Sequence, residues 1–320
     1  MSKNIYKILP ENADMRLDRL LQHLNPELGF GAMQKLCRTG QVRLDGKRVK
    51  GKERVQPGQE LRLPPHFEEN DKEPKPETNR ISNGDWKWLQ EAILYRDDDM
   101  IVLNKPAGLP VQAGSGHNRS ADRLMNGFCA PLKPRLVHRL DKATTGVLVF
   151  ALTRESAAAL TKQFASREAK KTYLAAVSGA LLEAQGELDF ALEKTAGDDG
   201  YEQMRAVHNQ RRAAETRGQQ ARTVYKRLQR TGNYQLVEAK PETGRTHQIR
   251  AHFSTVGSPI VGDTKYGGEG YKYKNKKNML LHAYTLELQH PKTQEALKFK
   301  APLPAPFQEF CTARGWVIKL

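Results

Sequence analysis

Residues 138–141, with the sequence HRLD, place an arginine and an aspartate on either side of one leucine. A Thr-Thr-Gly turn follows, and residues 147–152 have the apolar, β-branched composition of a strand. Asp141 is therefore expected on a loop at the mouth of a strand, where catalytic carboxylates are often presented. These residues alone leave two roles open for Asp141: it performs chemistry, or it anchors a turn.

Two more segments hold residue types that can act on a substrate, KTYL at 171–174 and GRTHQIRAH at 244–252. A carboxylate that must stay ionised while a nucleic-acid base displaces water needs a neighbouring cation, since desolvation alone raises its pKa. An aromatic ring can stack on a base that has left its helix. Tyr173 is a candidate for that role, although a lone tyrosine on a strand more often belongs to a core.

Other kinds of chemistry fit the sequence poorly. His247 and His252 are five residues apart, which does not put two ligands on one helical face, and the neighbouring arginines would repel a metal ion. The chain contains no GxSxG elbow, no Walker loop and no GxGxxG. We therefore expect neither a metal centre nor a Ser–His–Asp hydrolase.

The charge balance indicates the kind of partner. The net charge is +16 and the pI is about 9.7, so a polyanion is expected. The longest apolar runs are far too short to span a bilayer, and no segment near the N-terminus resembles a signal peptide, so nucleic acid is favoured over a membrane. Cys37, Cys129 and Cys311 lie far apart, which indicates buried thiols in a reducing cytoplasm.

Residues 1–67 are expected to form a small basic domain. Helical spacing in MRLDRLLQHL predicts one helix, a second is expected at about 31–38, and Asp45-Gly46 predicts a hairpin turn because both residues tolerate positive φ. The domain carries 13 Lys and Arg against 7 Asp and Glu. The cations crowd the second helix and the hairpin, which favours a phosphate-binding face over a merely solvated one. The candidate RNA-binding residues are Lys35, Arg38, Arg43, Lys47, Arg48 and Lys50.

The remainder of the chain is predicted to be a linker and a larger domain. Residues 68–91 are expected to be a linker, since 68–79 carry five acids and two prolines and no aliphatic side chain. In residues 92–320 strand patterns dominate without regular alternation, which predicts an α+β domain with a mixed, largely antiparallel sheet. Residues 205–230 carry eight cations and one acid. They are interpreted as an exposed basic loop or hairpin that grips phosphates, or as a charged insertion that aids solubility.

The chain resembles a known family through several motifs in order. HRLDKATTGVLVFA, KTYLA, GRTHQIRAH and LLHA, with NKPAG upstream, are similar to the motifs of the ribosomal large subunit pseudouridine synthases of the A/C/D class, and most to the C type. This resemblance runs from about residue 94 to the C-terminus. The N-terminal domain resembles the RNA-binding domain of ribosomal protein S4, through RLD at 16–18 and the pattern of residues 35–58.

The resemblance implies the pseudouridine synthase fold, preceded by a small α/β RNA-binding domain. It implies an isomerase that uses Asp141 as nucleophile, breaks the N1–C1′ bond of a uridine and joins C5 to C1′, with no cofactor. By the same match, Arg139 fills the space of the flipped nucleotide and Tyr173 stacks on the base. Arg245 pairs with the aspartate, and Leu281 packs against the base. The implied partner is large-subunit ribosomal RNA, with no membrane, and the chain is expected to be a monomer.

Two alternatives stay open at this point. A non-catalytic RNA-binding or ribosome-assembly factor of the same fold would be expected to lose its aspartate or the partners of that residue, yet Asp141, Tyr173 and Arg245 are all present. An unrelated nuclease would be expected to cluster metal-binding carboxylates, which the sequence does not show. The leading hypothesis is therefore an RNA pseudouridine synthase acting on large-subunit (23S-type) ribosomal RNA.

Overall fold

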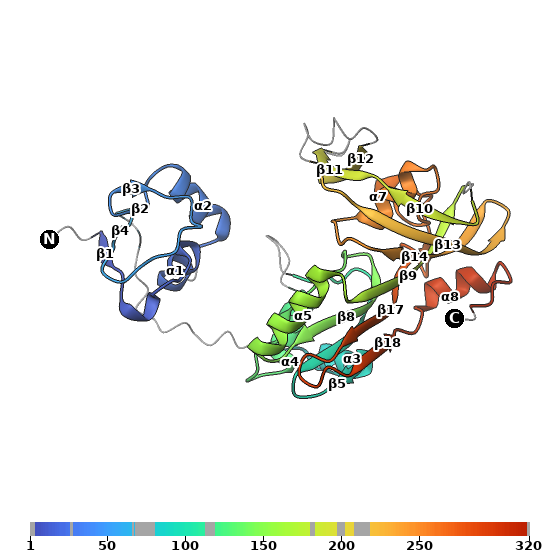
Figure 1. Ribbon diagram of the computed structural model, residues 1–320, viewed down its shortest axis with the longest axis horizontal. Coiled ribbons are helices and arrows are strands. Elements are labelled where there is room, and N and C mark those ends of the chain that lie inside the picture. Colours follow the sequence, from blue (N-terminus) through green and yellow to red (C-terminus); the bar gives the residue numbers. More distant parts are fainter. Residues whose placement is uncertain are drawn as a thin grey trace. The chain divides into compact units, whose positions relative to one another are not determined.

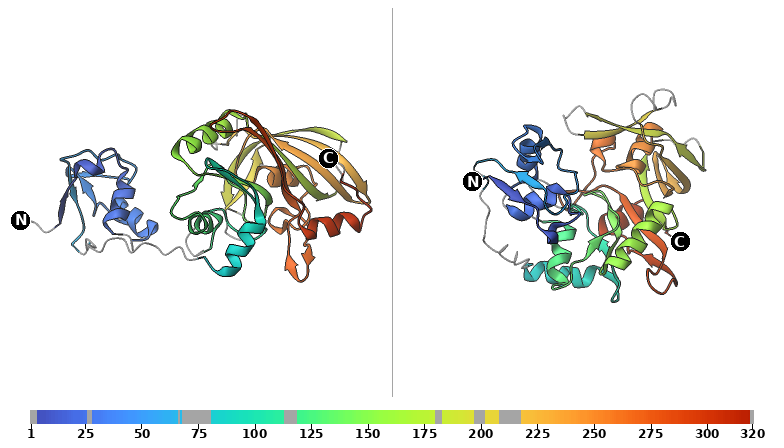
Figure 2. Two further views of the ribbon diagram at one scale, coloured as in Figure 1. Left: turned by 90° about the horizontal axis from the view of Figure 1, so that it is seen from below. Right: turned by 60° about the vertical axis from the view of Figure 1, so that its left-hand side comes forward.

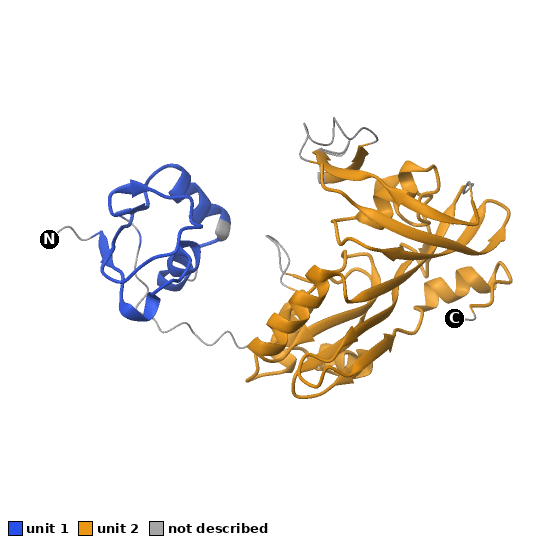
Figure 3. Cartoon of the chain, in the orientation of Figure 1, with its two compact units in different colours: residues 1–78 blue, residues 79–320 orange. Residues whose placement is uncertain are grey.

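A computed structural model describes residues 4–25, 28–65, 67, 81–112, 119–179, 183–196, 202–207 and 218–318. The chain divides into two compact units, Met1–Thr78 and Asn79–Leu320 (Figure 3). Each unit has its own cluster of buried apolar side chains.

The first unit is a four-stranded antiparallel sheet, in the order β1-β4-β2-β3, with two α-helices (Figure 1). Its elements are β1 (Ile5–Lys7), the 3-10 helix η1 (Pro10–Asn12), α1 (Leu17–Leu24), α2 (Phe30–Arg38), β2 (Arg43–Leu44), β3 (Lys47–Arg48) and β4 (Glu60–Arg62). Both helices and the hairpin were predicted. The hairpin turn has φ of 48° at Asp45 and 75° at Gly46, values that these residue types accept. Strand β1 was missed because three residues are too few to show an alternation.

The core of the first unit is built on the apolar stripe of α1. Leu17, Leu20 and Leu21 are fully buried, and they pack with Met33 and Cys37 of α2. Helical spacing places the three leucines on one side of α1, as the sequence predicts. This small core leaves the polar side of α2 and the β2–β3 hairpin on the surface.

The second unit is an α+β domain built on one ten-stranded sheet (Figure 1). Its helices are α3 (Asn83–Ala92), α4 (Ala121–Phe128), α5 (Arg154–Ser166), α7 (Gln248–Thr255) and α8 (Ala305–Thr312), with the 3-10 turn η2 (Thr264–Tyr266). The strands of the main sheet are β5 (Ile93–Arg96), β6 (Met100–Lys105), β7 (Arg135–Leu136), β8 (Thr145–Ala151), β9 (Lys170–Ser178), β10 (Gln185–Asp189), β13 (Arg222–Thr231), β14 (Tyr234–Pro241), β17 (Leu281–Gln289) and β18 (Ala296–Lys300). Two hairpins add β11 (Ala191–Ala196) with β12 (Glu202–Val207) and β15 (Lys272–Tyr273) with β16 (Lys276–Lys277).

The main sheet runs β10-β13-β14-β9-β17-β8-β6-β5, with β18 beside β17 and β7 beside β8. In the described part of the chain, every strand pair is antiparallel except β17 with β8. The predicted mixed, largely antiparallel sheet is therefore confirmed. The parallel pair is short: His282 lies opposite Thr145, and Ala283 opposite Gly146. Gly146 has φ of 109°, and a Cβ there would lie 2.1 Å from the carbonyl oxygen of Ala283, so this close approach requires glycine.

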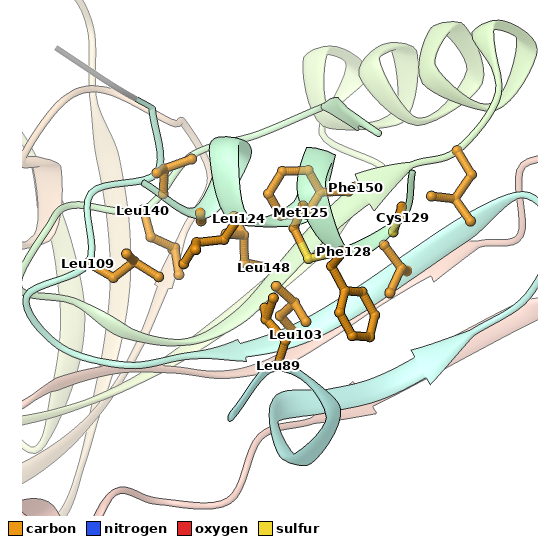
Figure 4. Close-up of a cluster of buried hydrophobic side chains, with 14 of the residues drawn as sticks. Leu89, Leu103, Leu109, Leu124, Met125, Phe128, Cys129, Leu140, Leu148 and Phe150 are labelled. Carbon is orange, nitrogen blue, oxygen red and sulfur yellow. The ribbon is translucent and has the colours of Figure 1, made fainter. Parts of the chain in front are cut away.

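The second unit begins earlier than the boundary predicted at residue 92. Helix α3, which the sequence pattern had assigned to the 68–91 linker, packs on this unit. Leu89 is fully buried together with Leu103 and Phe128 in the cluster of Figure 4. The ring centroids of Trp86 and Phe128 are 4.7 Å apart. A ten-residue helix directly after a polar segment carries too little periodicity to be separated from it by sequence, and residues 68–80 themselves lie outside the described residues.

Candidate active site

A cleft of about 370 Å³ opens beside the loop that precedes β8. The lining includes the five residues that the sequence placed in one pocket: Arg139, Asp141, Tyr173, Arg245 and Leu281. They come from the β7–β8 loop, β9, the loop between β14 and α7, and the start of β17. The topology of the sheet therefore brings the separate sequence motifs together, as expected.

The backbone that carries Asp141 is fixed at several points. The carbonyl of Asp141 accepts a hydrogen bond from the amide of Thr144 at 3.1 Å, which closes a turn over residues 141–144. The turn therefore lies before the predicted Thr-Thr-Gly position, and Thr145 and Gly146 already belong to β8. The carbonyl of Lys142, which follows Asp141, accepts a hydrogen bond from the amide of Gly108 at 2.8 Å. The loop then enters β8, all seven residues of which are buried. The Asp141 carboxylate, 20% exposed, thus projects into the cleft from an anchored backbone.

Lys105 lies beneath this loop and was not singled out by the sequence reasoning. The residue is 1% exposed, and its Nζ donates to the carbonyl oxygens of Pro106, Leu109 and Lys142 at 2.9, 3.0 and 3.2 Å. Three acceptors match the three N–H groups of an ammonium ion. Burial lowers the pKa of Lys105 to about 7, and the negative charge of Asp141 opposes that shift. Lys105 therefore ties the loop that carries Asp141 to the end of β6.

The ion-pair partner of Asp141 is Arg250, on the buried side of α7. Its Nη1 donates to Oδ2 of Asp141 at 3.1 Å, while Nε and Nη2 donate to the two carboxylate oxygens of Asp263 at 2.6 and 2.8 Å. The side chains of Arg250 and Asp263 are 9% and 2% exposed. Burial disfavours the charged guanidinium, but the hydrogen bonds and charges of Asp263, and then of Asp141, outweigh it and raise the pKa of Arg250. A fixed cation therefore stands beside the Asp141 carboxylate.

The predicted pairing of Arg245 with Asp141 is wrong. Arg245 is exposed at the edge of the cleft, and its Nε donates to the carbonyl oxygen of Gln220 at 3.2 Å. Helix α7 begins at Gln248, so Arg250 lies inside the helix and faces the core, whereas Arg245 precedes it. Both arginines belong to the same sequence motif, and only the start of the helix decides which one reaches the aspartate.

His247 faces Asp141 from a second side. Its Nε2 lies 3.9 Å from Oδ2 of Asp141, and its Nδ1 lies 2.9 Å from the hydroxyl of Tyr266. The guanidinium of Arg250 lies 4.8 Å from the centroid of that tyrosine ring. Burial is the largest effect on His247 and lowers its pKa, against the opposing charge of Asp141, which favours the neutral ring. Its φ of 52° is a left-handed value that side chains adopt at some cost, as is common at functional sites.

Tyr173 and Leu281 form an apolar wall of the cleft. Tyr173 lies opposite Ala239 of β14 and Ala283 of β17, so small side chains flank its ring on both neighbouring strands. Burial, together with the charge of Asp141, raises the pKa of Tyr173, so the phenol stays neutral. Leu281 is 3% exposed and packs with Ile249 of α7. Tyr173 also packs against two buried clusters, so it combines the core role and the cleft role that the sequence left open.

The candidate RNA-binding residues of the first unit lie on its surface, with one exception. Arg43 is half-buried, and its guanidinium donates to the carbonyl oxygens of Gly40 and Gly46 at 3.3 and 3.0 Å, so it fixes the hairpin turn. The exposed candidates are Lys35, Arg38, Lys47, Arg48 and Lys50. Contact of these five cations with RNA stays a prediction.

The basic stretch at 205–230 is only partly described, because residues 208–217 lie outside the described residues. Most of the described part is strand β13 rather than a loop. Arg222 on this strand is paired with Glu187 and Glu242 at 2.6 and 3.1 Å. That arginine is therefore engaged in cross-strand pairs and is not presented as a phosphate contact.

Three residues of this site escaped the sequence reasoning: Lys105, Asp263 and Tyr266. Asp263 follows Gly262, a turn signal that on its own is too common to indicate a site. Lys105 belongs to the NKPAG segment, which drew notice only through its resemblance to a family motif. A fully buried lysine is rare and would have indicated a special role for Lys105. The sequence does not show, however, whether a residue at the end of a strand is buried.

Comparisons with known proteins agree with this geometry. Residues 99–255 match the RNA pseudouridylate synthase family, and residues 15–61 match the S4 domain. The chain is 32% identical over 313 residues to ribosomal large subunit pseudouridine synthase C of Haemophilus influenzae, covering 94% of this chain and 92% of that one. It is 34% identical over 310 residues to ribosomal large subunit pseudouridine synthase D of Nitrosomonas europaea, covering 92% and 83%. The solved structure of human RNA pseudouridylate synthase domain containing 4 is 28% identical, covers 71% of this chain and 94% of that one, and gives a TM-score of 0.57.

The chain therefore belongs to the RNA pseudouridylate synthase family, with an S4 domain in its N-terminal part. It is an isomerase that converts uridine in RNA to pseudouridine. Within the described ranges, no helix is long and apolar enough to cross a membrane. The same ranges contain no group of three or more His, Cys, Asp or Glu residues arranged to hold a metal ion.

Proposed function

We propose that this enzyme isomerises specific uridines of large-subunit ribosomal RNA and that Asp141 is its nucleophile. The observation that carries the proposal is the Asp141 carboxylate, held by Arg250 at 3.1 Å on the wall of the 370 Å³ cleft. The names of the type C and type D relatives support the large-subunit substrate.

The reaction needs only groups that the chain supplies. The N1–C1′ bond of the target uridine breaks, a C5–C1′ bond forms, and the proton on C5 ends on N1. Atoms and electrons balance without an oxidant or a second substrate, so no cofactor is part of the proposal. Asp141 attacks the uridine and is released unchanged, and the Arg250 guanidinium stands beside it as the counter-charge while the base displaces water from the cleft.

The other cleft residues would hold the extruded nucleotide. Tyr173 and Leu281 offer an apolar wall on which the uracil ring stacks. Arg139 is exposed at the cleft and would occupy the space that the flipped nucleotide leaves in its helix. Arg245, which does not pair with Asp141, is exposed too and would contact a phosphate. The exposed cations of the first unit would bind RNA outside the cleft. We place the enzyme in the cytoplasm and expect it to act as a monomer.

The decisive experiment maps pseudouridines in ribosomal RNA from cells with and without this protein, and repeats the mapping with purified enzyme and unmodified RNA. Asp141→Asn keeps the shape of the side chain and removes its charge. We expect this variant to lose pseudouridine formation by at least about a thousandfold while its RNA affinity changes little.

Asp98→Asn is the matched control, since it makes the same chemical change at an exposed turn of the same unit. Turnover in Asp141→Asn comparable to that of the control would overturn the nucleophile. A wild-type protein that binds ribosomal RNA without forming pseudouridine would instead favour the non-catalytic assembly factor.

A further inference from the structure

A small basic hairpin stands apart from the sheet of the second unit. Among the described residues, strands β15 and β16 pair only with each other, and in Figure 2 (left) the hairpin extends away from the body of the unit. Its turn residues, Lys274 and Asn275, both have left-handed φ, 46° and 62°, the backbone form of a tight two-residue hairpin turn. Glycine would take the first of these positions at less cost. The chain instead carries a lysine at the tip.

The hairpin concentrates positive charge without compensation. Its four lysines are exposed, and within the described part of the chain none of them forms an ion pair. Residues 271–286 contain no acidic residue at all. Nζ of Lys274 lies 5.4 Å from the centroid of the half-buried Tyr273 ring. The four lysines are Lys272, Lys274, Lys276 and Lys277. A surface kept only for solubility would intersperse the two signs of charge.

The residues that flank the hairpin, Tyr271 and Asn278, form its root and anchor it to the rest of the unit. The amide of Asn278 donates to the carbonyl of Tyr271 at 2.9 Å, and the Tyr271 hydroxyl donates to the carbonyl of Pro306 at 3.1 Å. The Tyr271 ring meets Phe310 of α8 edge-on, with centroids 5.3 Å apart. A Cβ on Gly262 would lie 1.7 Å from the carbonyl oxygen of Asn278, so these two segments touch backbone to backbone.

The residue that touches this root, Gly262, is one peptide bond from the ion-pair network of the cleft. Gly262 is followed by Asp263, which holds Arg250, and Arg250 holds Asp141. A charge bound by the hairpin is therefore bound at a fixed position relative to the cleft. The segment lies beyond residues 99–255, where the family match is found, so its role is not carried by that match.

We propose that the β15–β16 hairpin binds the phosphate backbone of the substrate RNA next to the target uridine. The inference rests on the proposed function, because it assumes that RNA occupies the cleft. Lysine ammonium groups act as point charges on phosphates and do not read bases. The hairpin therefore contributes affinity and register, and leaves the choice of uridine to the cleft and to RNA shape.

The test replaces the four hairpin lysines by glutamine in the full chain and measures RNA affinity as a function of salt. Four lost phosphate contacts lower the slope of log K against log salt by about 3. The wild-type affinity would then fall about 60-fold more than that of the variant between 50 and 200 mM salt. The rate at saturating RNA should stay within about twofold of wild type, because no cleft residue changes.

Two further variants control this result. A scattered variant with Lys87, Lys133, Lys162 and Lys292 changed to glutamine removes the same charge from exposed positions of the same unit. It should lower the slope by less than about 1. A variant with four arginines in the hairpin should restore the wild-type slope, which shows that charge, and not a lost fold, explains the effect.

Equal slopes for the hairpin and the scattered variant would overturn the proposal. The proposal would also be overturned if the hairpin variant lost binding to phosphatidylglycerol vesicles but bound RNA as wild type does. That result would assign the hairpin to a lipid surface. The rate of the wild-type protein separates these outcomes from the proposed function. If wild type forms pseudouridine and the two variants behave alike, only the hairpin proposal fails.

Discussion

Replacing Arg250 by methionine tests the network that holds Asp141, the proposed nucleophile. Methionine keeps an unbranched side chain of similar reach and removes the guanidinium. Three hydrogen bonds disappear, two to Asp263 at 2.6 and 2.8 Å and one to Asp141 at 3.1 Å. The carboxylate of Asp263 is left almost fully buried, since that side chain is 2% exposed, and it has no cation beside it.

The loss of folding stability is set by the Asp263 carboxylate, which stays buried without its partner. Removing one partner of a buried ion pair costs about 3 to 5 kcal/mol, mostly because the other charge stays desolvated. Urea unfolding of Arg250→Met should therefore show a free energy of unfolding lower by about 3 to 5 kcal/mol at pH 7. Pseudouridine formation should fall to background, because Asp141 loses its cation.

Two comparison variants sharpen this result. Arg222→Met breaks two ion pairs as well, but its side chain is 41% exposed, so the loss should be about 1 kcal/mol or less. A double variant, Arg250→Met with Asp263→Asn, contains no buried unpaired carboxylate at residue 263. It should be more stable than Arg250→Met alone, by about 1 to 3 kcal/mol.

The reasoning is refuted if Arg250→Met costs no more than Arg222→Met, or if removing the Asp263 charge from Arg250→Met destabilises the protein further. Either outcome would mean that the Asp263 carboxylate is not held in the interior by the guanidinium.

Three other measurements test the structure. Burial lowers the pKa of His282 from 6.5 to about 4, and a hydrogen bond to the carbonyl of Ala301 opposes this shift. The neutral buried ring therefore contributes to the free energy of unfolding above pH 6.5, and this contribution is lost as the pH falls toward 4. Urea titrations at several pH values should show a loss of about 3 kcal/mol across that window, and a smaller one in His282→Asn; equal profiles would argue against a neutral buried ring. Lys105→Met should lower kcat at least about tenfold and change RNA affinity little, because it removes one of the two hydrogen bonds that hold the carbonyl of Lys142, next to Asp141. A change in KM alone would contradict this role. Changing the five exposed cations of the first unit to glutamine should lower the slope of log K against log salt for RNA binding by about 3 to 4. An unchanged slope would mean that this face does not touch RNA. The residues are Lys35, Arg38, Lys47, Arg48 and Lys50.

The sequence predicted best where a local pattern decides the structure. The β2–β3 hairpin follows from Asp45-Gly46, and the core of the first unit follows from the leucines of α1. The strands around Asp141 and Tyr173 follow from their apolar and β-branched composition. Residues of the separate motifs line one cleft, and their roles in that cleft stay predictions.

What the sequence could not decide is which side chains meet. Arg245 and Arg250 have the same chemistry, and the choice between them depends on a helix that starts at Gln248 after a left-handed residue. Asp263 reaches Arg250 only through a turn that follows the helix, so no spacing rule connects the two. The α3 boundary was missed for a similar reason: Leu89 belongs to the core because of strands that come later in the chain.

The short parallel contact between β8 and β17 has a mechanical consequence. Asp141 precedes β8, whereas Tyr173 and Arg250 belong to elements on the β17 side. The cleft therefore lies across the boundary between β8 and β17, where only two residue pairs of the described chain connect the strands. Apolar packing also joins the two halves of the sheet, for example of Val147 and Leu160 with Leu286 in one buried cluster. A substitution that loosens this cluster would let the halves tilt. The distance between Asp141 and the Tyr173 wall of the cleft would then change without any substitution in the cleft itself. The width of the active site is in this sense set by side chains that no substrate touches.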